Sequence, residues 1–306
     1  MRVRGDVLLS MALAAAAPLS QTTAPEADPT LGSAPTMASV PDFSGVWRHS
    51  SLPWFAPPAS GAGPVTNRSR RNGVSNYNQL IGDYTNPILQ PWAAQVVKAY
   101  GEISLGGATY PNPANQCWPE PVPFIFKNNG MQILQQPHQV TILYDENHQF
   151  RQVRLNAPHP PNVEPSWHGD SVGHYEGDTL TIDTVAVKTD RPFAMIDLFG
   201  TPYTKALHVI ERYRLLDYEG AKGGLERDAK ENYRPEGDLR PDDKGKWLQI
   251  RLTVEDEGAF TRPWSATVNY GTRPGAWVEK VCAENRFGFF STGREASVPT
   301  AKTPDF

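Results

Sequence analysis

The chain has 306 residues and a formal net charge of −4, from 29 Lys and Arg against 33 Asp and Glu. This slight acidic excess argues against a nucleic-acid-binding protein, and two cysteines are too few for a disulfide-dense miniprotein or a zinc finger. The 29 prolines, 25 glycines and 8 tryptophans favour turn-rich β structure over a helical bundle.

The N-terminus has the pattern of a secretory signal peptide, which we predict at residues 1–20. Arg2 and Arg4 precede a mostly apolar run at 7–19, which is too short to cross a membrane. No later stretch approaches the roughly 18 apolar residues of a membrane-spanning helix. We therefore expect no membrane span and predict a periplasmic or secreted protein.

The rest of the chain is predicted to form one domain between two tails. Residues 21–40 are rich in Pro, Ala, Ser and Thr and lack periodicity, which is typical of a flexible linker. We expect a single β-barrel domain at 41–290 and a C-terminal tail at 291–306. Within the domain, 110–123 holds five prolines and must be extended or turning.

One helix is predicted, at 87–101, with Pro91 as an alternative first turn and Gly101 at its end. Its apolar residues recur at helical spacing: Leu89, Trp92, Ala93, Val96, Val97 and Tyr100. The segment before it is long and irregular, with several loop signals between 48 and 85.

From about residue 130 the sequence is typical of short strands separated by turns. The predicted strands are 131–136, 139–144, 150–155, 172–176, 179–187, 207–216, 247–255, 264–270 and 277–283. A charged, glycine-rich segment at 218–245 is interpreted as a solvated loop insertion. Together these features predict a mainly β fold, an antiparallel up-and-down barrel of the lipocalin or calycin kind. Gly45-Val46-Trp47 has the G-x-W pattern that opens the first strand of such barrels.

The two cysteines, Cys117 and Cys282, lie 165 positions apart. In an oxidising compartment they are expected to form a disulfide, and two buried free thiols are the alternative.

Two polar segments hold the candidate functional residues. The first, 167–179, contains His168, Asp170, Ser171 and His174. A histidine beside a carboxylate can act as a general acid or base near neutral pH. A polar loop leading into a strand is also a common place for ligand binding. The alternative is structural, since the turn at 176–179 is a good hairpin turn.

The second segment, 207–214, contains His208, Glu211, Arg212 and Arg214. In a strand, His208 and the two arginines share one face and Glu211 lies on the other, so His208 and Glu211 do not converge by spacing alone. His208 is interpreted either as a cavity residue or as a satisfied core histidine. Asp183 is predicted to need Arg212 or Arg214 as a partner if its strand turns it inward.

Other signatures carry little weight. Ser171 lies in Gly169-Asp170-Ser171-Val172-Gly173, which matches G-x-S-x-G, but a strand follows where a nucleophile elbow needs a helix. A metal site built from His159, His168 and His208 is geometrically possible, yet their spacing gives it no support. We therefore expect neither a metal nor a cofactor.

Several separated motifs agree in order with a large, essentially uncharacterised family of exported bacterial β-rich proteins. The chain resembles that family at 167–184, 206–214, 263–264 and 281–285. It departs before His159, where members show D-G-R-x-H-P and this chain has Asn156-Ala157-Pro158-His159-Pro160. The resemblance implies export and a β-rich domain, and it implies no particular activity. A weaker analogy is to calycin-like barrels, some of which bind lipophilic ligands and some of which hydrate or isomerise them.

These observations favour an exported barrel enzyme that uses His/carboxylate acid–base chemistry on a small hydrophobic or aromatic molecule, as a lyase, isomerase or hydratase. The predicted catalytic residues are His168, Asp170, His208, Glu211 and Arg212, with His208 as acid or base, Asp170 as its partner and Arg212 as an anion stabiliser. The predicted substrate-binding residues are His159, Trp167, Ser171, His174, Asp183, Arg214 and Trp264. The alternatives are a non-catalytic lipocalin-like carrier of a hydrophobic small molecule and a structural protein with a filled barrel.

Overall fold

A computed structural model of the chain describes residues 40–49, 55–128, 130–190, 194–231, 245–272 and 281–282. These residues all belong to one compact unit, Ala34–Phe306. The predicted signal peptide, the C-terminal tail and all but one residue of the predicted linker lie outside the described residues. So does the predicted strand at 277–283, apart from residues 281 and 282.

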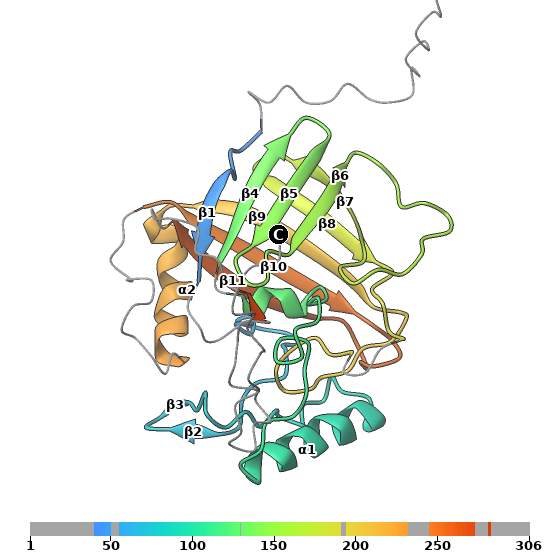
Figure 1. Ribbon diagram of the computed structural model, residues 1–306. Coiled ribbons are helices and arrows are strands. Elements are labelled where there is room, and N and C mark those ends of the chain that lie inside the picture. Colours follow the sequence, from blue (N-terminus) through green and yellow to red (C-terminus); the bar gives the residue numbers. More distant parts are fainter. Residues whose placement is uncertain are drawn as a thin grey trace, which may run out of the picture. The chain divides into compact units, whose positions relative to one another are not determined.

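Nine strands form a closed barrel in the order β1-β11-β10-β9-β8-β7-β6-β5-β4 (Figure 1). Their bounds are β1 Gly45–Arg48, β4 Gly130–Gln136, β5 Gln139–Tyr144, β6 Phe150–Leu155, β7 Asp170–Glu176, β8 Thr179–Val185, β9 His208–Leu216, β10 Trp247–Glu255 and β11 Trp264–Thr272. Two further strands, β2 Arg70–Arg71 and β3 Val74–Ser75, pair separately as a small hairpin. The mainly β fold and the barrel predicted from the sequence are thus confirmed.

The first strand closes the barrel. Trp47 of β1 pairs with Met131 of β4 on one side and with Thr272 of β11 on the other. The Trp47 indole is almost fully buried, and its Nε1 donates a hydrogen bond of 2.8 Å to the carbonyl of Phe43. A short strand with one large inward side chain therefore joins the two ends of the sheet.

One strand pair departs from the antiparallel barrel that the sequence predicts. β6 and β7 pair in parallel, whereas every other neighbouring pair in the barrel is antiparallel. A parallel pair needs a long connection to carry the chain back to the start of the next strand. Residues 156–169 supply it, with four prolines that favour extended backbone. This connection also carries His159 across the outside of the barrel toward β7 and β8.

The helices also differ in part from the prediction. Helix α1 runs from Pro91 to Leu105, so it begins at the alternative first turn and ends four residues later than predicted. A second helix, α2 Tyr218–Glu231, occupies the first half of the segment predicted to be a loop. Ala221 and Leu225, four residues apart on α2, are buried against Trp247. This apolar pair attaches α2 to the barrel. The other residues of α2 are mostly charged or glycine, and for that reason the sequence did not predict a helix here.

The residues of the core are those whose side chains point inward, and these are every second residue along each strand. On each barrel strand one set of alternate residues is buried, as in Val209, Glu211 and Tyr213 of β9. Large aromatic side chains fill much of the interior, including Trp264 and Tyr270 of β11, which are each about 2% exposed or less. The opposite set of side chains therefore forms the outer surface of the barrel.

The predicted disulfide is confirmed. Cys117 and Cys282 are bonded, with 5.4 Å between their Cα atoms, and the bond ties the proline-rich segment to residues near the C-terminal end of the domain. The backbone amide of Cys282 also donates a hydrogen bond to Asn147 in the turn between β5 and β6. Among the described helices, none is long and apolar enough to cross a membrane.

Candidate functional site

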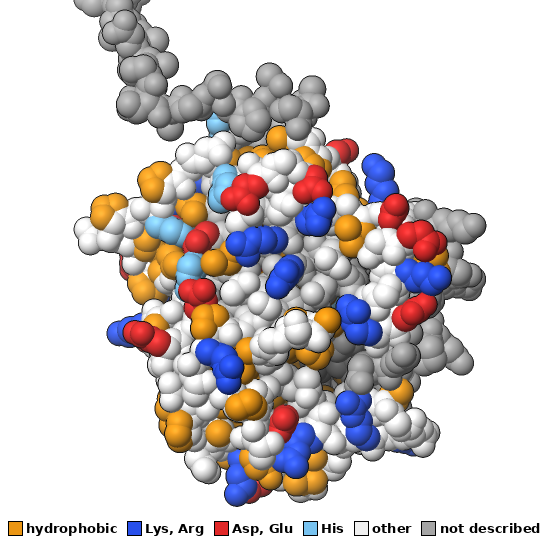
Figure 2. Space-filling model, turned by 180° about the vertical axis from the view of Figure 1, so that it is seen from behind, with side chains coloured by type: hydrophobic (Ala, Val, Ile, Leu, Met, Phe, Trp, Pro, Cys, Tyr) orange, Lys and Arg blue, Asp and Glu red, His pale blue; other side chains and the backbone are white. Residues whose placement is uncertain are grey.

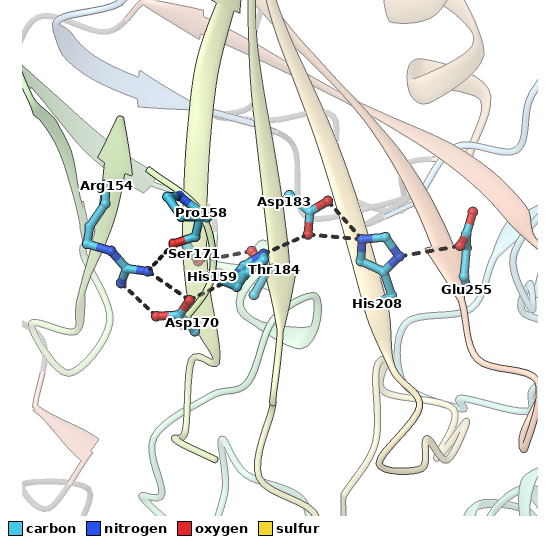
Figure 3. Close-up of polar contacts among 9 residues, drawn as sticks. All are labelled: Arg154, Pro158, His159, Asp170, Ser171, Asp183, Thr184, His208 and Glu255. Carbon is cyan, nitrogen blue, oxygen red and sulfur yellow. Dashed lines mark hydrogen bonds and ion pairs between the residues drawn. The ribbon is translucent and has the colours of Figure 1, made fainter. Parts of the chain in front are cut away.

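A row of six alternating basic and acidic side chains crosses the outside of the barrel (Figure 3). In spatial order its members are Arg154, Asp170, His159, Asp183, His208 and Glu255. They come from β6, β7, the 156–169 connection, β8, β9 and β10. We call this row the His/Asp ladder.

Strand alternation places these side chains on the outer face. On β8 the alternate residues Leu180, Ile182 and Thr184 form the inward, buried set, so Asp183 faces outward between two of them. On β9 the buried set begins at Val209, so His208 faces outward as well. The antiparallel register then pairs His208 with Glu255 of β10. The ladder therefore follows from the period of two and from the pairing of neighbouring strands.

In the first half of the ladder, Arg154 and His159 both contact the carboxylate of Asp170. Arg154 Nη1 and Nη2 donate to the two carboxylate oxygens of Asp170 at 2.7 and 3.0 Å. His159 Nδ1 lies 2.6 Å from Asp170 Oδ2. Two-pronged contacts of this kind hold a carboxylate in a defined orientation, so Asp170 in turn fixes the ring of His159.

The second half is centred on Asp183. His159 Nε2 lies 3.1 Å from Asp183 Oδ1, and His208 Nε2 lies 2.9 Å from both oxygens of the same carboxylate. The other ring nitrogen of His208, Nδ1, lies 3.4 Å from Glu255 Oε2. Asp183 therefore holds two imidazoles, and the loosest contact in the ladder is at His208 Nδ1.

Contacts within the ladder shift the pKa values of His208, Asp183 and Asp170. The pKa of His208 is raised above its ordinary value, chiefly by the hydrogen bond to Asp183, and burial opposes this effect only in part. Burial favours the neutral form of Asp183, but hydrogen bonds from His208 and His159 outweigh it and lower the pKa of that carboxyl. The bonds from Arg154 are the main cause of a lowered pKa at Asp170.

His208 is the member of the ladder best placed to exchange a proton with a bound molecule. Its side chain is 30% exposed, while Asp183 holds its Nε2 atom and fixes the ring. Glu255 is itself 43% exposed and contacts Nδ1 only at 3.4 Å, so another acceptor or donor can replace it there. A carboxylate on one ring nitrogen and an accessible second nitrogen is the arrangement of a general acid or base.

The ladder is not arranged as a metal site. In Figure 3 the Asp183 carboxylate lies between the two imidazoles, so the rings face it from either side instead of converging on a common point. Within the part of the chain that the structure describes, no group of three or more His, Cys, Asp or Glu side chains could hold a metal ion. His168 of the alternative three-histidine site lies elsewhere, with its Nδ1 atom 2.8 Å from the carbonyl of Glu120.

The other predicted site residues are not brought into the ladder. Ser171 is buried and its hydroxyl contacts that of Thr184 at 2.9 Å, inside the barrel wall. His174 pairs with Glu176, and Arg214 pairs with Asp178, both at the surface. The Trp167 ring lies 6.4 Å from the ring of Trp118 and the Lys188 ammonium lies over it, while Trp264 is part of the core.

Glu211 lies on the inner face of β9 and so does not meet His208. Its Oε2 atom accepts hydrogen bonds from Arg151 at 2.7 Å and from the Tyr213 hydroxyl at 2.8 Å. Burial and the adjacent Glu211 carboxylate raise the pKa of Tyr213 well above its ordinary value, which keeps its proton in place. Glu211 thus has an enclosed structural environment. Asp183 faces outward, so the condition for an arginine partner does not arise, and its contacts are with His159 and His208.

The sequence analysis did not single out three residues that make these contacts: Arg154 and Glu255 of the His/Asp ladder, and Arg151, the partner of Glu211. Arg151 carried a usable signal, because it shares its position in the alternating pattern with Val153 and Leu155 and so had to face inward with them. Arg154 and Glu255 carried no such signal in the sequence, because an exposed charged residue on a strand is ordinary. Their roles depend on which strands are neighbours.

Comparison of the chain with protein-family models, with curated proteins and with solved structures found no match.

Proposed function

We propose that the protein is an exported enzyme that performs acid–base chemistry at the His/Asp ladder on a small hydrophobic or aromatic molecule, as a lyase, isomerase or hydratase. The observation that carries this proposal is the geometry of His208. Asp183 orients the ring at Nε2, and among the described residues Nδ1 has one polar contact, at 3.4 Å with the partly exposed Glu255.

His208 would work in either direction. The protonated ring donates a proton from Nδ1, and the neutral ring, with its remaining proton on Nε2 toward Asp183, accepts one at Nδ1. Asp183 keeps this tautomer and stabilises the imidazolium when it forms, while His159 and the Arg154–Asp170 pair hold Asp183 in place. Asp183 is thus a positioning residue for His208.

Export is part of the proposal. The Cys117–Cys282 bond supports it, because disulfides persist in oxidising compartments. The signal-peptide pattern at residues 1–20 supports it independently. We also propose a relationship to calycin-like barrels, and the closure of the barrel through Trp47 supports it.

The test is turnover by the purified mature protein. A panel of small hydrophobic and aromatic compounds with acidic C–H bonds, double bonds or β-hydroxyl groups is incubated with the protein, and products are detected by mass and by proton exchange with D2O. His208→Ala should lower the turnover of any converted compound by about 10²–10⁴-fold. His138→Ala, at the exposed turn between β4 and β5, is the matched control. Full turnover by His208→Ala would exclude the proposed role.

The alternative is a non-catalytic carrier of a hydrophobic molecule. A carrier would bind members of the same panel without converting them, and its affinity would not depend on His208. The large aromatic side chains inside the barrel, including Trp264, Tyr270 and Tyr213, favour a site on the outer surface over one in the interior.

A further inference from the structure

Two arginines face each other on the outside of the barrel. Arg212 of β9 and Arg251 of β10 are direct partners in the antiparallel register, and both side chains are exposed. Like charges at directly opposite positions destabilise a pair of strands. A negatively charged group near Arg212 and Arg251 would offset this repulsion.

Neighbouring charges do not neutralise this pair. Arg214 is bound to Asp178 at 2.7 Å, and Glu176 is bound to His174 at 2.6 Å. Glu176 still interacts with Arg212 through space, but at the described residues neither Arg212 nor Arg251 has a hydrogen bond or an ion pair. On the face seen in Figure 2, basic side chains lie beside the histidine and acidic side chains.

A third polar group lies in the same row. Thr181 of β8 pairs with Arg212 in the register and faces outward, two residues before Asp183. Its residue is only 6% exposed, and its hydroxyl is buried with no hydrogen-bond partner. Buried hydroxyls are normally hydrogen-bonded, so an orphaned one marks a place where a ligand or an ordered molecule belongs.

We propose that Arg212, Arg251 and Thr181 form a binding site for a small oxyanion, a carboxylate or a phosphate group. Guanidinium groups present planar sets of donors that match such anions, and one anion between two of them removes their mutual repulsion. The Thr181 hydroxyl supplies a further donor from the adjacent strand. The site uses Arg251, which the sequence did not single out.

The position of the site suggests what it is for. Asp183 lies two positions after Thr181 on β8, about 7 Å along the strand. An anionic group held at the arginines would place the rest of a small molecule over the His/Asp ladder. This assignment of a substrate class, small organic acids or phosphate esters with a hydrophobic body, rests on the proposed function.

Binding is tested without any turnover. Acetate, sulfate and inorganic phosphate are titrated separately into the ¹⁵N-labelled mature protein, and the arginine Nε–Hε signals are followed by NMR. We expect saturable shifts of the Arg212 and Arg251 signals. Arg212→Gln or Arg251→Gln should raise the apparent Kd at least tenfold, and the near-isosteric Thr181→Val about five- to tenfold. Arg214→Gln, on the same face but paired with Asp178, should change it less than twofold.

The outcomes separate the possibilities. A preference for phosphate and sulfate over acetate supports a phosphate ester as ligand, and equal or tighter acetate binding supports a carboxylic acid. The absence of a saturable shift with all three anions overturns the site, as does an equal loss of affinity in Arg214→Gln or unchanged affinity in Thr181→Val. Loss of turnover in His208→Ala with intact anion binding leaves this site standing, so the two proposals fail separately.

Discussion

His208 and Glu211, three residues apart on β9, lie on opposite sides of the barrel wall. His208 is partly exposed and belongs to the His/Asp ladder, while Glu211 is fully buried and paired with Arg151. One strand therefore contributes a carboxylate to the interior and an imidazole ring to the outer surface. The two residues should therefore respond differently to mutation.

Replacing Asp183 should change the acidity of His208. In Asp183→Asn the hydrogen bond and the negative charge that raise the His208 pKa are lost, so that pKa should fall toward its ordinary value. The ring proton signals of His208 in an NMR pH titration measure this directly. Asp178→Asn, which removes a surface carboxylate paired with Arg214, is the control. An unchanged His208 titration in Asp183→Asn would contradict the assigned contact.

The ladder should also make stability depend on pH. Because the folded pKa of His208 is raised, its contribution is complete below the unfolded value of about 6.5 and is lost as pH rises through the folded value. Because the folded pKa of Asp183 is lowered, its contribution is present above about pH 4 and is lost as pH falls through the folded value. Urea unfolding should therefore show the largest stability difference between wild type and Asp183→Asn between about pH 4 and 6.5. A difference that grows toward pH 9 would be inconsistent with the ladder.

Glu211→Gln should destabilise the fold strongly. It leaves the Arg151 guanidinium buried beside a neutral group, and breaking a buried ion pair in this way costs about 3–5 kcal/mol. The double variant Arg151→Met with Glu211→Leu removes both charges and should recover much of that loss. Denaturant unfolding of the two variants gives the comparison, and equal stability of single and double variants would rule out an uncompensated charge as the cause.

Breaking the disulfide should lower stability without removing the barrel strands. Cys117 and Cys282 close a loop spanning 165 positions, for which the chain-entropy model gives about 4–5 kcal/mol, an upper-end value. Unfolding of the double variant Cys117→Ala with Cys282→Ala, compared with oxidised wild type, measures this contribution, and reduced wild type is the control for the substitutions themselves. Far-UV circular dichroism of the variant should retain the β signal, since neither cysteine lies in a described barrel strand.

Gly169, directly before Asp170, should tolerate no side chain. Its φ is +74°, and a Cβ there would lie 2.5 Å from the carbonyl oxygen of Val185. Gly169→Ala should therefore cost about 1–3 kcal/mol and displace Asp170 from His159. Gly177→Ala is the matched control, because Gly177 has φ +59° but open space around its Cβ position, so only backbone strain of about 1 kcal/mol applies. Equal costs for the two variants would argue against crowding at Gly169.

Local patterns in the sequence determined the strands and the separation of their faces. The alternation in 207–214 placed His208 and Glu211 on opposite faces, and eight predicted strands from 131 to 270 correspond to β4–β11. Alternation works because successive side chains of a strand must point to opposite sides. It failed for α2, where high charge concealed the buried pair Ala221 and Leu225.

The sequence alone determined that this chain has a β-rich domain, two cysteines placed for a disulfide, and histidines beside carboxylates. On β9, only the tertiary structure decided which face is the interior, because both alternate sets of side chains, the one with His208 and the one with Glu211, carry charged residues. It also decided that the connection after β6 returns the chain to a parallel partner, which brings His159 to Asp183 across 24 residues. Residues as distant as Arg154 and Glu255 form one site because strand neighbours are fixed by long-range pairing, which no local pattern encodes.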